Sequence, residues 1–158
     1  MVKKQEKVNQ VRIIVDTNIV FSGILNTSSK IGKILINSNV HFQFYSCDYL
    51  KTEILRHRER LLKITKLPAS ELAELESIVC ENITFINEAL IPQEYLKSSE
   101  TLLKNIDIND TVFVALAKHL DAKLWTGDLQ LYNGLKAKRF KNIITTSELS
   151  VLLDELEN

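Results

Sequence analysis

The sequence predicts an α/β fold in which a mostly parallel sheet of about five short strands is covered by helices on both faces. Only 4 glycines and 2 prolines interrupt the 158 residues, and so few turn residues argue against an all-β sandwich or barrel. Short β-branched segments alternate with segments of helical apolar spacing, which is typical of parallel sheets with crossover helices. The 45% apolar content can fill such a core without metal ions or disulfide bonds.

The first half of the chain is expected to supply strands and helices after a polar tail at residues 1–10. No repeat, linker or change of composition divides residues 11–158, which are therefore predicted to form one domain. A β-branched run predicts the first strand, alternation predicts the second, and helical spacing of apolar residues predicts the helices. The elements expected here are a strand at 12–16, helices within 19–25 and 31–35, a strand at 40–45, a helix at 49–64, and a helix at 71–81 with Ser70 as its N-cap.

The second half carries clearer signals for the ends of its elements. Pro92 is placed to open a helix, because proline fits the first helical turn. Thr145, with Glu148 three residues later, has the capping-box pattern that starts a helix. The segment 112–117 is apolar on nearly all sides, which predicts a helix packed between the sheet and other helices. The elements expected here are a strand at 83–86, helices at 92–104 and 112–117, strands at 123–126 and 142–144, and a helix at 145–156.

Charge and cysteine content exclude several classes of function. The 20 Lys and Arg balance the 20 Asp and Glu, so any binding of nucleic acid must rest on a local patch. Cys47 and Cys80 are too few and too far apart for a zinc site or a disulfide framework, and both are expected in or near the core. No signal peptide or run of about 18 apolar residues is evident, which predicts a cytoplasmic protein without a membrane partner.

Acidic residues follow the strands of the predicted sheet at the positions where ligands of α/β proteins bind. Asp16 follows the first strand, Glu53 lies one turn into the helix after the second, Asp107 and Asp110 open a helix, and Asp128 follows the fourth strand. Carboxylates that lie close together repel, and a divalent cation relieves that repulsion. Oxygen ligands without histidine or cysteine suit Mg²⁺ or Mn²⁺, which can activate water against a phosphodiester.

Each acid also has an ordinary structural explanation. Asp107 and Asp110 can cap a helix, Asp128 after a glycine can make a turn, and Glu53 can be a solvated charge. Asp16 is harder to explain in this way, because it ends a strand buried on both faces. Four or five acids at equivalent positions are a much rarer coincidence than any one of them, and this favours a metal site.

Four short motifs, in this order, resemble those of the PIN domain family over residues 11–150. They are Val15 to Asn18, Glu53 after a strand and helix start, Asp110 to Ala117, and Trp125 to Asp128. The resemblance implies a three-layer α/β/α domain and a metal-dependent ribonuclease acting on single-stranded RNA. It implies a metal cluster of Asp16, Glu53, Asp110 and Asp128, supported by Asn18, Thr126 and Asp107. The chain is similar to bacterial PIN proteins that are toxins of toxin–antitoxin pairs, which implies an antitoxin protein as partner and a homodimer.

Basic residues cluster on the helix that carries Glu53 and again after Asp128, where they can flank RNA on the acidic site. Those predicted to bind RNA are Lys51, Arg56, Arg58, Lys136 and Lys138. The three histidines, His41, His57 and His119, have no ligand spacing and are expected at the surface or the edge of the core. Trp125 and Phe113 fall inside buried elements and are expected in the core rather than against bases.

Other functions could also use acids at strand ends, and two of them fit this sequence poorly. A haloacid-dehalogenase-like phosphatase needs a second acid where this chain has Asn18, and a receiver domain needs a lysine where it has Asp128. A non-catalytic protein that binds a metal or a partner through the same acids is the alternative from another class. A general RNA-processing nuclease without an antitoxin is the alternative within the same class. Apolar helices within residues 19–35 offer a surface for self-association.

Overall fold

The computed structural model describes residues 10–158, so the polar tail predicted at 1–10 lies, except for Gln10, outside the described residues. Five strands form one sheet in the order β3-β2-β1-β4-β5, and every neighbouring pair is parallel. The predicted α/β class with a parallel sheet is therefore confirmed. The strands are β1 Val11–Val15, β2 Phe42–Cys47, β3 Ile83–Ile86, β4 Lys123–Trp125 and β5 Ile143–Ile144.

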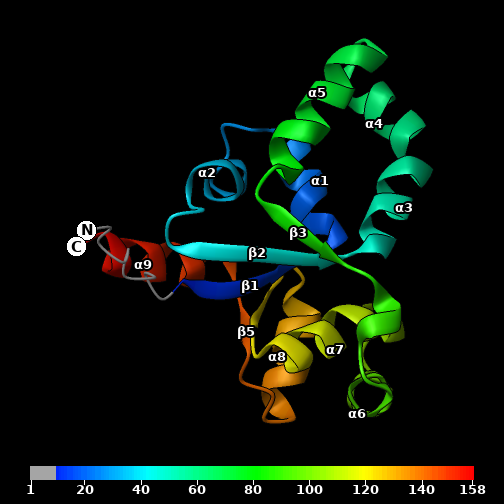
Figure 1. Cartoon of the computed structure of the whole chain (residues 1–158), viewed down its shortest axis with the longest axis vertical. Coiled ribbons are helices and arrows are strands. Elements are labelled where there is room, and N and C mark those ends of the chain that lie inside the picture. The colour runs from blue at the N-terminus through cyan, green and yellow to red at the C-terminus, as the bar shows by residue number, and fades with distance from the viewer. Residues whose placement is uncertain (1–9) are drawn as a thin grey trace, which may run out of the picture.

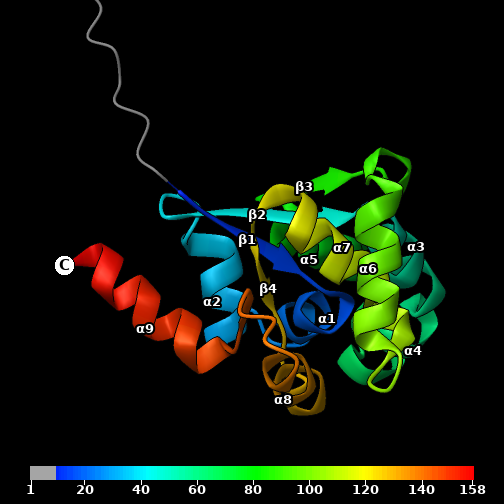
Figure 2. The same ribbon diagram turned by 90° about the horizontal axis from the view of Figure 1, so that it is seen from below.

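Helices cover both faces of the sheet (Figure 1). One layer contains α1, α2 and α5, and the opposite layer contains α6, α7 and α8, as the view in Figure 2 also shows. The helices are α1 Thr17–Leu25, α2 Lys30–Asn37, α3 Asp48–Arg56, α4 Arg58–Thr65, α5 Ala69–Cys80, α6 Gln93–Leu103, α7 Thr111–Leu120, α8 Leu129–Ala137 and α9 Thr146–Glu157. Two short 3-10 turns, η1 Glu88–Leu90 and η2 Ile108–Asp110, precede α6 and α7.

Successive side chains of β1 point to opposite faces of the sheet and so contribute to both hydrophobic layers. Ile13 and Val15 pack into the layer with α1, α2 and α5, whereas Ile14 packs into the layer with α7 and α8. All three are fully buried, as expected for a central strand covered on both faces. Trp125 and Phe113 are also buried, as the sequence predicted.

The strand order fixes where a ligand can enter. β1 lies between β2 and β4, so the chain turns to opposite sides of β1 and leaves a crevice at its carboxyl end. The register pairs Val15 with Trp125, which places Asp16 and Thr126, the next residues of the two strands, side by side. Residues 110 positions apart in sequence thus meet at the edge where the acids were predicted.

Three helices differ from their predictions. The helix α5 begins at Ala69 after Pro68, so Ser70 is not its N-cap. The single helix expected at 49–64 is divided at His57, whose ψ of 8° ends α3 and precedes α4. The helix α8 was not predicted at all, although Asp128 caps it and Leu131 and Leu135 are buried one turn apart. The capping box of Thr145 with Glu148 at the start of α9 is confirmed.

Most apolar residues of α1 and α2 face the core, with Ile19, Ile24 and Leu35 all buried, whereas Leu25 is exposed. Most of the surface predicted there for self-association is therefore used by the fold, and self-association stays a prediction. Among the described residues, no single helix is long and apolar enough to cross a membrane, and α1 and α2 meet that test only as a pair bent by 103°.

Candidate active site

Asp16 is held at the carboxyl end of β1 by hydrogen bonds to both carboxylate oxygens. It is the N-cap of α1, and its Oδ1 accepts a bond from the Ile19 backbone N–H at 2.9 Å. Its Oδ2 accepts a longer bond, of 3.4 Å, from the Thr126 hydroxyl. The same hydroxyl accepts a bond from the Asp128 N–H, so Thr126 links the ends of two acidic segments. With only 5% of its surface exposed, Asp16 is a buried carboxyl at the end of a central strand.

Three of the four predicted metal-binding acids line one cavity of about 360 Å³ beside the end of β1. Asp16 comes from the start of α1, Glu53 from α3 after β2, and Asp110 from the end of η2 before α7. Asp107 and Asn18 also line this cavity, which we call the acid cavity. The predicted convergence of Asp16, Glu53 and Asp110 at one edge of the sheet is therefore present in the structure.

Asp128 follows β4 at the same edge of the sheet, but its side chain caps a helix instead of lining the acid cavity. Its exposed side chain caps α8, where Oδ1 accepts bonds from the backbone N–H groups of Gln130 at 2.9 Å and Leu131 at 3.2 Å. The side chain is not among those that line the acid cavity in the described residues. Its negative charge nevertheless raises the pKa of both Asp16 and Asp110.

Burial and crowding disturb the titration of two acids. Burial, the largest cause, raises the pKa of Asp16 from 3.8 to about 6. Burial, together with the charges of Asp16, Asp107 and Asp128, raises the pKa of Asp110 to about 7. Both carboxylates are thus unfavourable as anions in the metal-free protein, and a bound cation would offset this disadvantage.

Glu53 already has partners on its own helix. Its Oε2 lies 3.3 Å from Nε2 of His57, one turn later. A hydrogen bond from the Tyr49 hydroxyl to Glu53 raises the pKa of that hydroxyl. His57 and Tyr49 also line the acid cavity, so the structure adds two residues that sequence reasoning did not assign to the site. The helical spacing of Tyr49, Glu53 and His57 was the available signal.

The donor set fits a divalent cation in its chemistry. Asp16, Glu53 and Asp110 offer only oxygen atoms, which are the ligands that Mg²⁺ and Mn²⁺ prefer. In the part of the chain that the structure describes, no three His, Cys, Asp or Glu side chains already approach closely enough to enclose an ion. Asp16, Glu53 and Asp110 share the acid cavity, and Glu53 is also in contact with His57.

Comparison with known proteins decides the family. The family model described as the PIN domain matches residues 14–151, which include all four acids. The chain belongs to the PIN domain family. PIN domains are generally nucleases, and they generally use divalent metals.

A solved structure agrees with this assignment at the level of the fold. It is the crystal structure of VapBC2 from Rickettsia felis bound to a DNA fragment from its promoter. The similarity has a TM-score of 0.63 and covers 85% of this chain and 97% of that chain. Sequence identity is 16%, so the likeness supports the PIN fold alone. No curated protein sequence matches the chain.

The residues predicted to support the acids of this PIN domain differ in how they do so. Thr126 contacts Asp16 through its side chain, whereas Asn18 lines the cavity and donates its backbone N–H to Asp16. Asp107 caps η2, where its Oδ1 accepts a bond of 3.0 Å from the Asn109 N–H. All three lie at the carboxyl end of the sheet.

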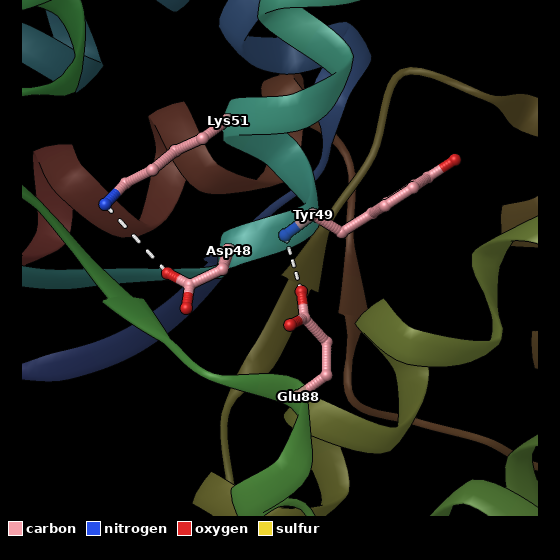
Figure 3. A network of polar contacts seen from close by, with 4 residues as sticks. All are labelled: Asp48, Tyr49, Lys51 and Glu88. Carbon is pink, nitrogen blue, oxygen red and sulfur yellow. Dashed lines mark hydrogen bonds and ion pairs between the residues drawn. The ribbon is translucent and has the colours of Figure 1, made fainter.

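Two of the basic residues predicted to bind RNA are engaged away from the acid cavity. Lys51 lies 3.9 Å from Asp48 at the start of α3, where the Tyr49 backbone N–H donates to Glu88 (Figure 3). Arg58 donates to Glu76 at 2.6 Å and, like Lys51, lines a separate cavity between α3 and α5.

The remaining predicted RNA contacts also lie outside the acid cavity among the described residues. Lys138 donates to the Leu102 carbonyl at 2.6 Å, and Lys136 lies 3.4 Å from the Lys141 carbonyl oxygen. Arg56 is exposed on α3. Their role in RNA binding stays a prediction.

The raised pKa values of Asp16 and Asp110 predict how the metal-free PIN domain responds to pH. Between about pH 4 and pH 7 the folded state binds more protons than the unfolded state, because both carboxyls hold their protons more tightly when folded. Stability should therefore fall as pH rises through this window. Melting curves in EDTA should show a lower melting temperature at pH 8 than at pH 5.5, and a smaller difference in Asp16→Asn. An equal difference in both proteins would contradict the raised pKa of Asp16 as a cause of this pH dependence.

Proposed function

We propose that the protein is a metal-dependent endoribonuclease that hydrolyses phosphodiester bonds of single-stranded RNA. The observation that carries the proposal is the meeting of Asp16, Glu53 and Asp110 in one cavity at the carboxyl edge of the sheet. The raised pKa values of Asp16 and Asp110 support it, because burial and, to a smaller extent, neighbouring acids disfavour the carboxylate anions, and a bound cation would offset this.

Mg²⁺ or Mn²⁺ held by Asp16, Glu53 and Asp110 would activate a water molecule and neutralise charge on the scissile phosphate. Thr126 and the backbone N–H of Ile19 fix the Asp16 carboxylate, so this ligand is oriented before the ion arrives. His57 and Tyr49 hold Glu53 at the cavity wall in a similar way. Asp128 adds negative charge from the start of α8 that favours cation binding.

We further propose that the nuclease is the toxin of a toxin–antitoxin pair. The structural neighbour is part of a VapBC2 complex, which supports an antitoxin protein as a partner of this chain. A homodimer, which rests on the resemblance to bacterial PIN toxins, and a cytoplasmic location, which rests on the sequence pattern, belong to the same proposal. A general RNA-processing nuclease without an antitoxin is the second candidate, and co-purification with the product of an adjacent gene would favour the toxin.

A nuclease assay tests the activity. The purified protein with Mn²⁺ should cleave a labelled single-stranded RNA, and EDTA should stop the reaction. A duplex of the same RNA with its complement should be cleaved more slowly, because its phosphates are held in a rigid helix. Binding of RNA without cleavage under all metal conditions would instead favour a non-catalytic interaction protein.

Asp128→Asn separates the charge of Asp128 from its capping role. Asparagine caps helices about as well as aspartate, so the melting temperature should change little. Cleavage should fall about 10- to 100-fold, the range typical for groups that support a metal site. Asp128→Ala provides the comparison, since it should also lose roughly 1 kcal/mol of stability with the cap. Full activity of Asp128→Asn at parental stability would show that Asp128 is a helix cap only.

A further inference from the structure

A second cavity of about 510 Å³ opens directly beside the acid cavity, between α1 and α4. The two cavities share three lining residues, Asn18, Phe21 and His57. The two cavities therefore adjoin at these three residues, which places the second cavity next to the acids. Its volume lies within the range of roughly 300–1,000 Å³ that is usual for ligand sites.

The walls of this second cavity combine apolar and aromatic surface with the guanidinium of Arg60. Leu25 and Ile64 line it with 44% and 54% of their surfaces exposed, so their apolar surface is open to a ligand. Phe21 and His57 meet edge to face, with ring centres 5.5 Å apart and planes at 81°. Arg60 adds an exposed guanidinium to the same cavity.

These features match the parts of a nucleotide. Flat apolar and aromatic walls accept the face of a base, and stacking of this kind tolerates any base sequence. Arg60 is suited to a phosphate of the same strand, because a guanidinium forms paired hydrogen bonds with phosphate oxygens. Asn18 and His57 stand at the junction with the acid cavity, where the backbone of the strand would pass.

We infer that this second cavity is a nucleotide subsite, which takes the base next to the scissile phosphate and binds its neighbouring phosphate through Arg60. The inference rests on the proposed ribonuclease function and names the part of the chain that holds the substrate. Phe21, Leu25 and Ile64 form the base-contacting wall. Single-stranded RNA is the substrate that fits, because a paired base is not free to enter a cavity.

Charge favours RNA over a peptide segment of a partner protein as the occupant. Among the described residues, the second cavity is lined by the guanidinium of Arg60 and by no carboxylate, whereas the acids line the adjoining cavity. A strand with phosphate at Arg60 and at the metal site would satisfy both cavities at once. A peptide could pair a basic side chain with the acids, but it would also need an acidic group for Arg60, whereas every nucleotide of RNA carries a phosphate.

Steady-state cleavage of single-stranded RNA by Phe21→Ala and Arg60→Gln tests the subsite. Each variant should raise KM, while kcat should change less. In Phe21→Ala, loss of the base contact should raise KM by about 5- to 150-fold. Arg60→Gln should also reduce the salt dependence of binding by about one phosphate contact. Lys63→Gln is the matched control, because it removes a charge from the same helix at a position outside both cavities in the described residues. Melting curves verify that each variant is folded.

An abasic scan around the mapped cleavage site makes the test independent of folding. One abasic position should raise KM for the parent protein, and the same RNA should have little further effect in Phe21→Ala, because the two changes remove the same contact. Parental KM values for both folded variants, with no sensitive abasic position, would overturn the subsite while leaving the nuclease intact; a cavity for a partner peptide gives this result. Failure of the parent protein to cleave would overturn both proposals.

Discussion

Asp16→Asn is expected to abolish metal-dependent cleavage of single-stranded RNA while the protein remains folded. The loss should be on the order of 10²–10³-fold or more, as for removal of a preorganised charge at a reacting centre. Asp16 is 5% exposed, lines the acid cavity and carries a pKa raised to about 6, so its charge has no evident structural benefit. Asparagine removes that charge and keeps the size of the side chain.

The local structure explains why this variant should fold. An asparagine Oδ1 can accept the same bond from the Ile19 N–H, and asparagine is as good an N-cap as aspartate. Its amide can donate to the Thr126 hydroxyl in place of the bond that the carboxylate accepts. In EDTA at pH 8 the variant should melt slightly above the parent protein, because the buried charge is gone.

A matched substitution controls for loss of a negative charge in general. Asp154→Asn changes an exposed residue of α9, a helix that contributes no lining residue to either cavity in the described chain. Its cleavage rate should equal that of the parent protein. Retained cleavage by folded Asp16→Asn would contradict the mechanism, and a strongly lowered melting temperature would identify Asp16 as a structural cap.

Mn²⁺ is expected to stabilise the folded parent protein and to stabilise Asp16→Asn much less. A ligand at 100 times its Kd adds about 2.7 kcal/mol of stability, which corresponds to roughly 5–10 °C in melting temperature for a chain of this size. The effect should be larger at pH 8 than at pH 5.5, because protons compete with the ion for Asp16 and Asp110.

Melting curves of both proteins with and without Mn²⁺ measure this prediction. Asp154→Asn should respond to Mn²⁺ as the parent protein does. An equal shift in the parent protein and Asp16→Asn would place metal binding elsewhere on the chain. No shift in the parent protein, at concentrations that support cleavage, would argue against a preformed cation site in the acid cavity.

The local pattern of the chain was sufficient to predict the sheet and the positions of the acids. Asp16 follows a strand whose apolar residues are buried on both faces, and that burial can be read from Ile13 to Val15. The side-by-side placement of Asp16 and Thr126 required the register of β1 against β4. That register depends on packing between distant segments, which spacing along the chain does not specify.

The predictions that failed also depended on packing between distant segments of the chain. Helix α8 contains Gly134, a poor helix former, and the structure explains it by tertiary packing, since a Cβ there would lie 2.7 Å from Cδ1 of Ile106. The break at His57 has no glycine or proline to announce it. Arg58 was expected to face RNA, but its partner Glu76 comes from another helix. Each outcome depends on contacts between segments rather than on local pattern.

Diffraction from a crystal soaked in Mn²⁺, recorded at the manganese absorption edge, tests the central claim most directly. The claim is that the acid cavity binds the divalent cation that the protein needs to hydrolyse RNA. It predicts an anomalous peak within bonding distance of carboxylate oxygens of Asp16 and Asp110, and no such peak in Asp16→Asn. A peak at other residues only, or an acid cavity without manganese in a protein that cleaves RNA with Mn²⁺, would contradict it.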